Sequence, residues 1–375
     1  MSATLPRAVH PAAWWGWAVG MAVAVSTTNN PLLLFLALAV VALVVANRRG
    51  SSPWARAFRL YLWLGLFIIV VRVVLHVLVG LKFGEVVLFT LPEVTLPSWA
   101  AGIQLGGTVY LEGLLGAAVL GLRLAVIIAC IGAANALANP KRLLRSLPSA
   151  LHEIGSAVVV SVSVAPQLAE SVQRVRRARQ LRGDTTRGIR SVPSVALPVL
   201  EDTLERSLLL AAAMDSRGYG RAGAAPRSHR LLTGAVTLVG LLAAALGIYG
   251  VLDTTTPALM GTPALLLGLA LSTLGLWLGG RHVERSSYRP DPWRGAEWLT
   301  LGCGVVAAAA LVTISRTDPQ SLAMPLSPLA FPPLPIAAVV GLLVGALPAY
   351  LTPEPPRPAS RVPQRGAREE VLARG

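Results

Sequence analysis

Two copies of one short pattern, Ala-x-x-x-Arg-Gly, stand in a basic stretch between residues 168 and 219. One copy spans residues 178–183 and the other spans residues 213–218. In both, the arginine ends a helix-like pattern, and the glycine after it is a residue at which helices often stop in the left-handed conformation. A planar guanidinium at such an end suits a bidentate bond to an acidic group. We therefore expect two helix ends that each present one arginine to a partner.

Each arginine belongs to a set of residues at i, i+3, i+4 and i+7, which share one helix face. An ordinary helix end is the alternative, because basic residues favour helix C-termini, where the dipole is negative. The repeated alanine and stripe weaken that alternative without removing it. The two sets are Val175, Ala178, Arg179 and Arg182, and Leu210, Ala213, Met214 and Arg217.

Motifs for enzymatic chemistry are absent from the chain. It holds no Gly-x-x-x-x-Gly-Lys-Ser/Thr, Gly-x-Ser-x-Gly, His-Glu-x-x-His or Cys-x-x-Cys. Cys130 and Cys303 lie in separate apolar runs and are expected to be packed thiols, and the five histidines show no metal-ligand spacing. Glu201 and Asp202 are expected on a solvated helix face. We therefore expect no enzyme, no catalytic residue, no metal site and no cofactor.

The composition places most of the chain in lipid. Of the 375 residues, 54% are hydrophobic and 14% are charged, against about 25% charged in soluble domains. The net charge is +15, and arginines are densest between residues 138 and 230, which indicates a cytoplasmic position for that stretch. These arginines are not interleaved with aromatic residues, so no nucleic-acid partner is expected.

The apolar runs predict an all-α polytopic membrane protein with about eight transmembrane helices. An N-terminal transmembrane region (12–138) is followed by a cytoplasmic domain (139–230), a C-terminal transmembrane region (231–351) and a disordered tail (352–375). The spans are expected at about 12–28, 31–46, 60–80, 109–138, 231–252, 264–280, 296–315 and 336–351, with an extended or re-entrant piece at 82–108.

The distribution of arginines between the loops predicts the orientation. With eight spans and a cytoplasmic N-terminus, every arginine-rich loop falls on the cytoplasmic side, and so does the C-terminus. The cytoplasmic domain is then expected to hold long amphipathic helices between the fourth and fifth spans. Residues 166–182 and 200–216 carry that pattern, and residues 185–198, with two prolines, are expected to be a linker.

Arg72 and His76 lie one turn apart in the third expected span. Ionisable groups within a span usually face protein or water because lipid solvates them poorly. A structural ion pair is the favoured interpretation over a functional role, and Glu112 on the next span is the candidate partner.

The chain resembles the transmembrane (T) component of energy-coupling-factor ABC transporters, a family that includes the CbiQ-type cobalt and nickel proteins. The resemblance covers roughly residues 12–250, so the last two or three spans lie beyond the common core. Leu181 and Ser216 depart from the family pattern, in which alanine is commonest. The matching segments are Leu181-Arg182-Gly183-Asp184, Ser216-Arg217-Gly218-Tyr219, Asn29-Asn30-Pro31 and Asn139-Pro140-Lys141-Arg142-Leu143-Leu144.

The resemblance implies a subunit in the cell (plasma) membrane that couples two cytoplasmic ABC ATPases to a small membrane-embedded substrate-binding (S) component. The cargo would be a vitamin or a transition-metal ion. Arg182 and Arg217 would pair with acidic residues, one motif on each ATPase. The ATPase-coupling residues would be Ala178, Leu181, Arg182, Gly183, Ala213, Ser216, Arg217 and Gly218. The residues facing the S component would be Leu168, Val172, Val175, Leu200, Leu204 and Leu208.

A stand-alone membrane protein is the alternative, either a secondary transporter or a lipid-handling enzyme. Its basic stretch would simply bind anionic lipid. This alternative requires no ATPase partner, and it tolerates lysine in place of Arg182 or Arg217, which a bidentate arginine site does not.

Overall fold

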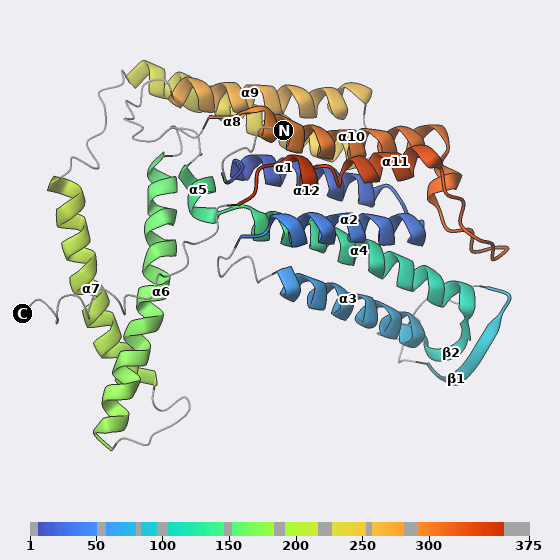
Figure 1. Cartoon of the computed structure of the whole chain (residues 1–375), viewed down its shortest axis with the longest axis horizontal. Helices are drawn as coiled ribbons and strands as arrows, with labels where there is room; N and C mark the ends of the chain where they lie inside the picture. Colours follow the sequence, from blue (N-terminus) through green and yellow to red (C-terminus); the bar gives the residue numbers. More distant parts are fainter. Residues whose placement is uncertain are drawn as a thin grey trace, which may run out of the picture. The chain divides into compact units, whose positions relative to one another are not determined.

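A computed structural model gives the architecture of the chain (Figure 1). It describes residues 7–50, 58–79, 84–95, 104–145, 152–183, 192–216, 227–252, 257–280 and 292–355. The chain forms two compact units, which are described separately below. The first unit joins Met1–Leu143 to Asp291–Gly375, and the second is Leu144–Pro290. The C-terminal transmembrane region expected as one piece is therefore shared between the two units.

The elements are mostly helices, as expected for an all-α polytopic membrane protein. The first unit contains α1 (Pro11–Ser26), α2 (Pro31–Arg48), α3 (Phe58–Val79), β1 (Val87–Thr95), β2 (Gln104–Tyr110), α4 (Leu111–Leu137), α10 (Gly295–Thr317), η6 (Pro319–Leu322), α11 (Ile336–Val344) and α12 (Pro348–Leu351), and α5 (Pro140–Arg145) begins in it. The second unit contains α6 (His152–Leu181), α7 (Val192–Ser216), α8 (Arg227–Leu252), η5 (Ala258–Met260) and α9 (Thr262–Gly280).

Six helices in the described residues are long and apolar enough to cross a membrane, namely α2, α3, α4, α8, α9 and α10. A span needs about 20 residues. The first and last expected spans fall short of that length, because α1 has 16 residues and the apolar helical stretch at the C-terminal end covers Ile336–Leu351. The chain is a multi-pass membrane protein, and the count of eight spans stays a prediction.

The core of the first unit is built where α1 packs between α4 and α10, with α2 and α11 beside them. Trp17 and Met21 of α1 and Leu311 of α10 are fully buried in this core. The backbones of α1 and α10 come unusually close at Gly20 and Gly304. A Cβ on Gly304 would lie 2.6 Å from Trp17 Cα, so glycine is required there. The helices α10 and α11, which follow the region of family resemblance (roughly residues 12–250), thus complete the core formed by the N-terminal helices.

The turn between α1 and α2 fastens the segment after α10. Asn30 caps α2 through its Oδ1, which accepts the Leu32 amide at 3.0 Å, and Pro31 takes the first helical position. The Asn30 side chain also donates to the Pro333 carbonyl at 2.6 Å. The Asn29 amide donates to the Leu322 carbonyl at 2.8 Å. The Asn-Asn-Pro segment therefore joins two parts of the chain that lie far apart in sequence.

A buried ion pair fastens the other end of α1 to α10. Glu297, whose side chain is fully buried, lies 2.9 Å from the guanidinium of Arg7. Its carboxylate also accepts the backbone N–H of His10 at 3.2 Å and that of Arg294 at 3.0 Å. A buried carboxylate is tolerated because these donors replace its lost hydration.

The stretch expected to be extended holds the antiparallel strands β1 and β2. Glu112, at the start of α4, accepts the backbone N–H of Val86 at 3.1 Å, next to this hairpin. Its carboxylate is therefore engaged with the hairpin, and the candidate pairing of Glu112 with Arg72 is wrong. The amide of Val86, which donates to Glu112, is closer to it in sequence than Arg72 is.

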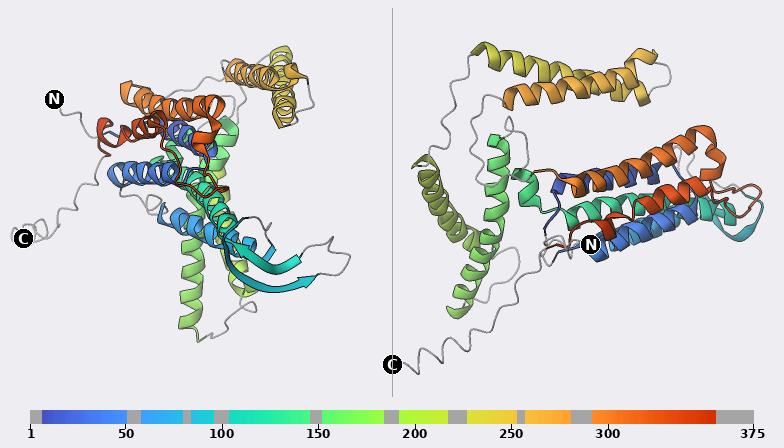
Figure 2. Two further views of the ribbon diagram at one scale, coloured as in Figure 1. Left: turned by 90° about the vertical axis from the view of Figure 1, so that its right-hand side faces the viewer. Right: turned by 45° about the horizontal axis from the view of Figure 1, so that its top comes forward.

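The second unit contains a helical hairpin, α8 and α9, whose helices run side by side (Figure 2). Four glycines line their contact, and a fifth, Gly250, faces Met260 of η5. A Cβ added at Gly240, Gly247, Gly250, Gly268 or Gly275 would meet backbone or side-chain atoms of the facing element. Small residues permit such close approach in membrane helices, where packing replaces the hydrophobic drive.

Replacing Gly304 by leucine should lower the stability of the first unit by about 1–3 kcal/mol, because the side chain would collide with the α1 backbone. Gly302, on the same helix, has open space where a Cβ would lie, so Gly302→Leu is the matched control. Labelling of the buried Cys130 and Cys303 by a thiol-reactive dye during heating in detergent measures the effect. Equal unfolding temperatures for the two variants would contradict this packing.

Candidate functional site

The two basic-motif helices of the sequence are α6 and α7, which cross one another in the second unit (Figure 1). α6 is continuous through Pro166. α7 begins at Val192 and runs through Pro198, so the second half of the expected linker is wrong. Pro193 is tolerated in the first helical turn, where the N–H has no intrahelical partner. Pro198 removes one interior hydrogen bond, and tertiary packing through Val195 and Val199 outweighs that loss.

The crossing of α6 and α7 includes a part-buried polar contact next to apolar side chains. Ser171 of α6 is buried, and its hydroxyl donates to Asp202 Oδ2 of α7 at 2.7 Å. Arg206 Nε donates to the other carboxylate oxygen at 3.1 Å. Val195 and Val199, which precede Asp202 on α7, are also buried. The sequence analysis expects Asp202 on a solvated face and does not include this contact. Only the crossing of the two helices brings Ser171 and Asp202 together.

The ionised form of Asp202 is favoured by its neighbours. The hydrogen bond from Ser171 lowers the pKa of the Asp202 carboxyl, and Arg206 and Arg174 lower it further, against the opposing effect of desolvation. The charged carboxylate is therefore part of the contact at neutral pH.

The first Arg-Gly end has the predicted left-handed glycine stop. Gly183 has φ +83° and its amide donates to the Gln180 carbonyl at 3.1 Å. A non-glycine residue would be strained there. Arg182 is exposed in the final turn, and the preceding Leu181 is 90% exposed. An apolar side chain and a cation therefore stand together at the tip of α6 with no covering residue among those described.

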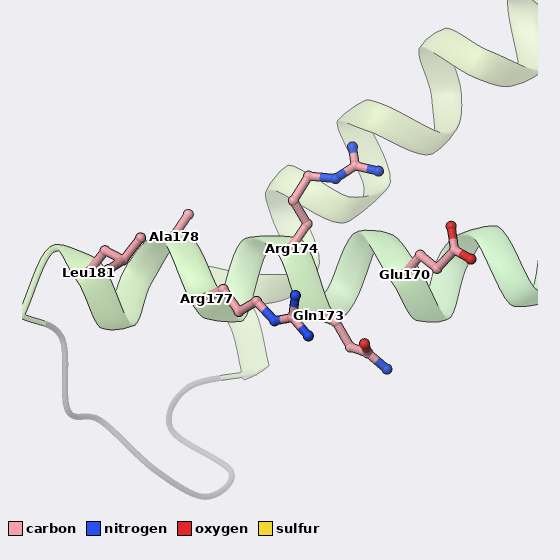
Figure 3. Close-up of a pocket in the computed structure, with 6 residues that line it drawn as sticks. All are labelled: Glu170, Gln173, Arg174, Arg177, Ala178 and Leu181. Atoms are coloured by element: carbon pink, nitrogen blue, oxygen red, sulfur yellow. The ribbon is translucent and has the colours of Figure 1, made fainter. Parts of the chain in front are cut away.

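A shallow hollow of about 440 Å³ runs along α6 toward this tip (Figure 3). Its lining residues repeat at three- and four-residue spacing, so they share one helix face. Ala178 and Leu181 lie at the end nearest the stop, and two arginines lie behind them. Of the lining residues, the sequence analysis names only Ala178 and Leu181 as coupling residues. The other four lie on the same helix face at the same three- and four-residue spacing. The lining is Glu170, Gln173, Arg174, Arg177, Ala178 and Leu181.

The second Arg-Gly end is placed only in part. Ala213 and Ser216 lie in the last turn of α7, where Ser216 Oγ donates to the Ala213 carbonyl at 3.0 Å. Arg217 and Gly218 lie outside the described residues. Each of the two motifs thus lies at the C-terminus of its own helix. The position of the second arginine, Arg217, stays a prediction.

The apolar residues expected to face another subunit behave differently on the two helices. On α7, Leu200, Leu204 and Leu208 form a stripe in which each side chain is at least 63% exposed. On α6, Val172 and Val175 are half-buried, while Leu168 is exposed. The α7 stripe is therefore the larger unpartnered apolar surface, and Leu197, which the sequence reasoning omitted, extends it.

Within the described parts of the chain, no three histidine, cysteine, aspartate or glutamate side chains gather as a metal site. Cys130 and Cys303 are both buried free thiols in the first unit. The described side chains of α6 and α7 offer exposed charges and exposed apolar surface.

Comparison with known proteins gives two matches. The model of the CbiQ family, described as "Cobalt transport protein", matches residues 4–229. The energy-coupling factor transporter transmembrane protein EcfT of Streptococcus equi subsp. equi (strain 4047) is 29% identical over 106 residues, which is 26% of this chain and 39% of that protein. The family match includes α6 and α7 and ends at the start of α8.

Asp202→Asn should loosen the α6–α7 crossing at pH 7, because the amide loses the charge that Ser171 and Arg206 stabilise. The folded pKa lies below the unfolded value of about 3.9, so this contribution is present above that pH and is lost as the pH falls through the folded pKa. Spin labels at Gln173→Cys and Glu205→Cys report the interhelical distance distribution. It should broaden in the variant at pH 7, and the wild type should broaden likewise once the pH has fallen through the folded pKa of Asp202.

The control for this experiment is Asp215→Asn, an exposed carboxyl on the same helix. It should leave the distribution unchanged at both pH values. A narrow distribution in Asp202→Asn at pH 7 would show that the carboxylate does not hold the crossing.

Proposed function

Because the chain belongs to the CbiQ family of cobalt transport proteins, we propose that it is the transmembrane coupling subunit of an energy-coupling-factor importer. In this role the chain hydrolyses no ATP. It transmits movement from two cytoplasmic ABC ATPases to a small membrane-embedded substrate-binding subunit, which carries a vitamin or a transition-metal ion. The named relative is a transmembrane protein of such a transporter, which supports the assignment.

The tip of α6 is the observation that carries this proposal. Leu181 and Arg182 are exposed at a helix end that Gly183 stops sharply. The guanidinium is suited to an acidic residue on an ATPase surface, and the leucine to an apolar recess beside it. A desolvated arginine–carboxylate pair at an interface loses about 2–5 kcal/mol when one partner is truncated. One such contact is therefore enough to decide whether the ATPase stays bound.

The second tip and the α7 stripe complete the proposed arrangement. Arg217, following Ser216 at the end of α7, takes the second ATPase in the same manner. Leu200, Leu204 and Leu208 offer an exposed apolar stripe to the substrate-binding subunit. The tips then face the cytoplasm, together with both chain termini, in the plasma membrane. This orientation follows from the arginine-rich loops.

Purification of the full chain from its own membranes in mild detergent tests the class. Two ABC ATPase subunits and one small membrane protein should remain bound, and the ligand of that small protein identifies the cargo. Recovery of the chain without any ATPase, at low as well as high salt, would contradict the proposal. It would favour a stand-alone protein whose basic helices bind anionic lipid.

Arg182→Ala should reduce ATPase retention at least about tenfold, because truncation leaves the partner's carboxylate unpaired. Arg182→Lys should also fail, because an ammonium cannot replace the bidentate guanidinium. The readout is the amount of ATPase that co-purifies with the full chain. Arg176→Ala is the matched control, since Arg176 is exposed on another face of the same helix. Equal ATPase recovery with Arg182→Ala and Arg176→Ala would refute the assigned role.

A further inference from the structure

α3 has an unusual position in the first unit, because its helix contacts are with α4. The contact is close, since a Cβ on Gly65 would lie 3.0 Å from Ala125 Cβ and one on Gly121 would lie 3.1 Å from Ile69 Cα. Of all the residues of α3, which the structure describes throughout, only Phe58 and Gly65 are buried. The other residues of this apolar helix are half-buried or exposed, and the exposed ones are open to lipid or to another protein.

Arg72 interrupts this open surface. The Gly65–Ala125 and Gly121–Ile69 contacts fix an antiparallel register, which places Arg72 about level with Ala118 of α4. The arginine side chain is exposed, and His76 lies one turn further on and half-buried. A cation in the apolar part of a span requires a partner, because lipid chains do not solvate it.

The described spans hold no free carboxylate for Arg72. Glu112 is about 9 Å further along α4 and is bonded to the Val86 amide. Glu297 is paired with Arg7. Neither α8 nor α9, the two spans of the second unit, contains an aspartate or a glutamate. Wherever the second unit lies, those spans cannot supply the missing charge.

The depth of Arg72 favours a protein over a lipid headgroup. α3 has 22 residues, about 33 Å of helix, and Arg72 lies about 10 Å before its C-terminal end. Side chains on a helix lean toward its N-terminus. The guanidinium therefore leans from the nearer membrane surface toward the middle of the bilayer, away from the closest phosphate groups.

We propose that the face of α3 around Arg72 binds a transmembrane helix of a second membrane protein through an aspartate or glutamate on that helix. The carboxylate neutralises Arg72, and exposed apolar side chains on the same side of α3, such as Leu64 and Leu75, pack against the same helix. This surface belongs to the membrane part of the chain and is separate from the proposed ATPase contacts on α6 and α7.

A cross-link through residue 72 tests the proposal. Arg72→Lys places an amine at the site, and a membrane-permeant apolar carbodiimide joins an amine to a carboxylate in contact with it. Native membranes containing this variant should yield a product that links Lys at position 72 to an acidic residue in a transmembrane segment of another polypeptide. Arg59→Lys, an exposed position at the start of the same helix, should give no such product.

A second variant keeps the test decisive if lysine does not support binding. Arg72→Leu should lower the recovery of that polypeptide by more than about tenfold, and Arg59→Leu should not. ATPase retention reports separately on the proposed coupling role, and it should be unchanged in both. The proposal is overturned if neither the link nor the selective loss occurs. It is also overturned if lysine couples to phosphatidylserine, to this chain's own carboxylates or to a second copy of the chain.

Discussion

The contact between the backbones of α1 and α10 at Gly20 and Gly304 is the constraint on which the first unit depends. Helices within a membrane gain little from hiding apolar surface, so they associate where backbones approach closely and where polar groups find partners. Here both conditions are met along one seam. The glycines allow the approach, Glu297 binds Arg7 at one end, and Asn29 and Asn30 bind the segment after α10 at the other.

This seam gives a role to helices that lie beyond the family match. α10, α11 and α12 cover α1 and α2 and leave Trp17 and Met21 fully buried. Residues 144–290 are consequently an insertion into a unit that is closed by residues from both ends of the chain. The proposed ATPase-binding helices α6 and α7 lie within that insertion. Their own crossing is weaker, because it rests on a few valines and the Ser171–Asp202 contact.

Local features of the structure were predictable from sequence, whereas contacts between distant residues were not. Asn30 with Pro31, and Gly183 after Arg182, act on their own neighbouring backbone, so residue type alone is enough to indicate a helix start and a helix stop. The long apolar runs likewise indicated about eight spans, and six of these are helices of spanning length in the described residues. Pairings depend on which helices meet. Glu112 was assigned to Arg72 on the assumption that adjacent spans share their charges, but a nearer backbone amide binds it.

The same limit applies to the candidate site. The spacing of Val175, Ala178 and Arg182 indicated one helix end with an exposed arginine, and the structure has that end. The spacing did not reveal that Ser171 meets Asp202, because nothing in either helix alone fixes the crossing point. The sequence predicts a linker at Pro198 because proline disfavours helix interiors. Packing of the neighbouring Val195 and Val199 overrides that preference.

The closure of the first unit also bears on how the protein is made. Arg7 and Glu297 are 290 residues apart, and ribosomes add about 5–20 residues per second. For roughly 15–60 seconds, α1 is therefore present while the helix that packs against Trp17 is still unsynthesised. During that interval the face of α1 that α10 later occupies must find other apolar surroundings. The apolar character of α1 on all sides, which makes it a poor amphipathic helix, suits it to both surroundings.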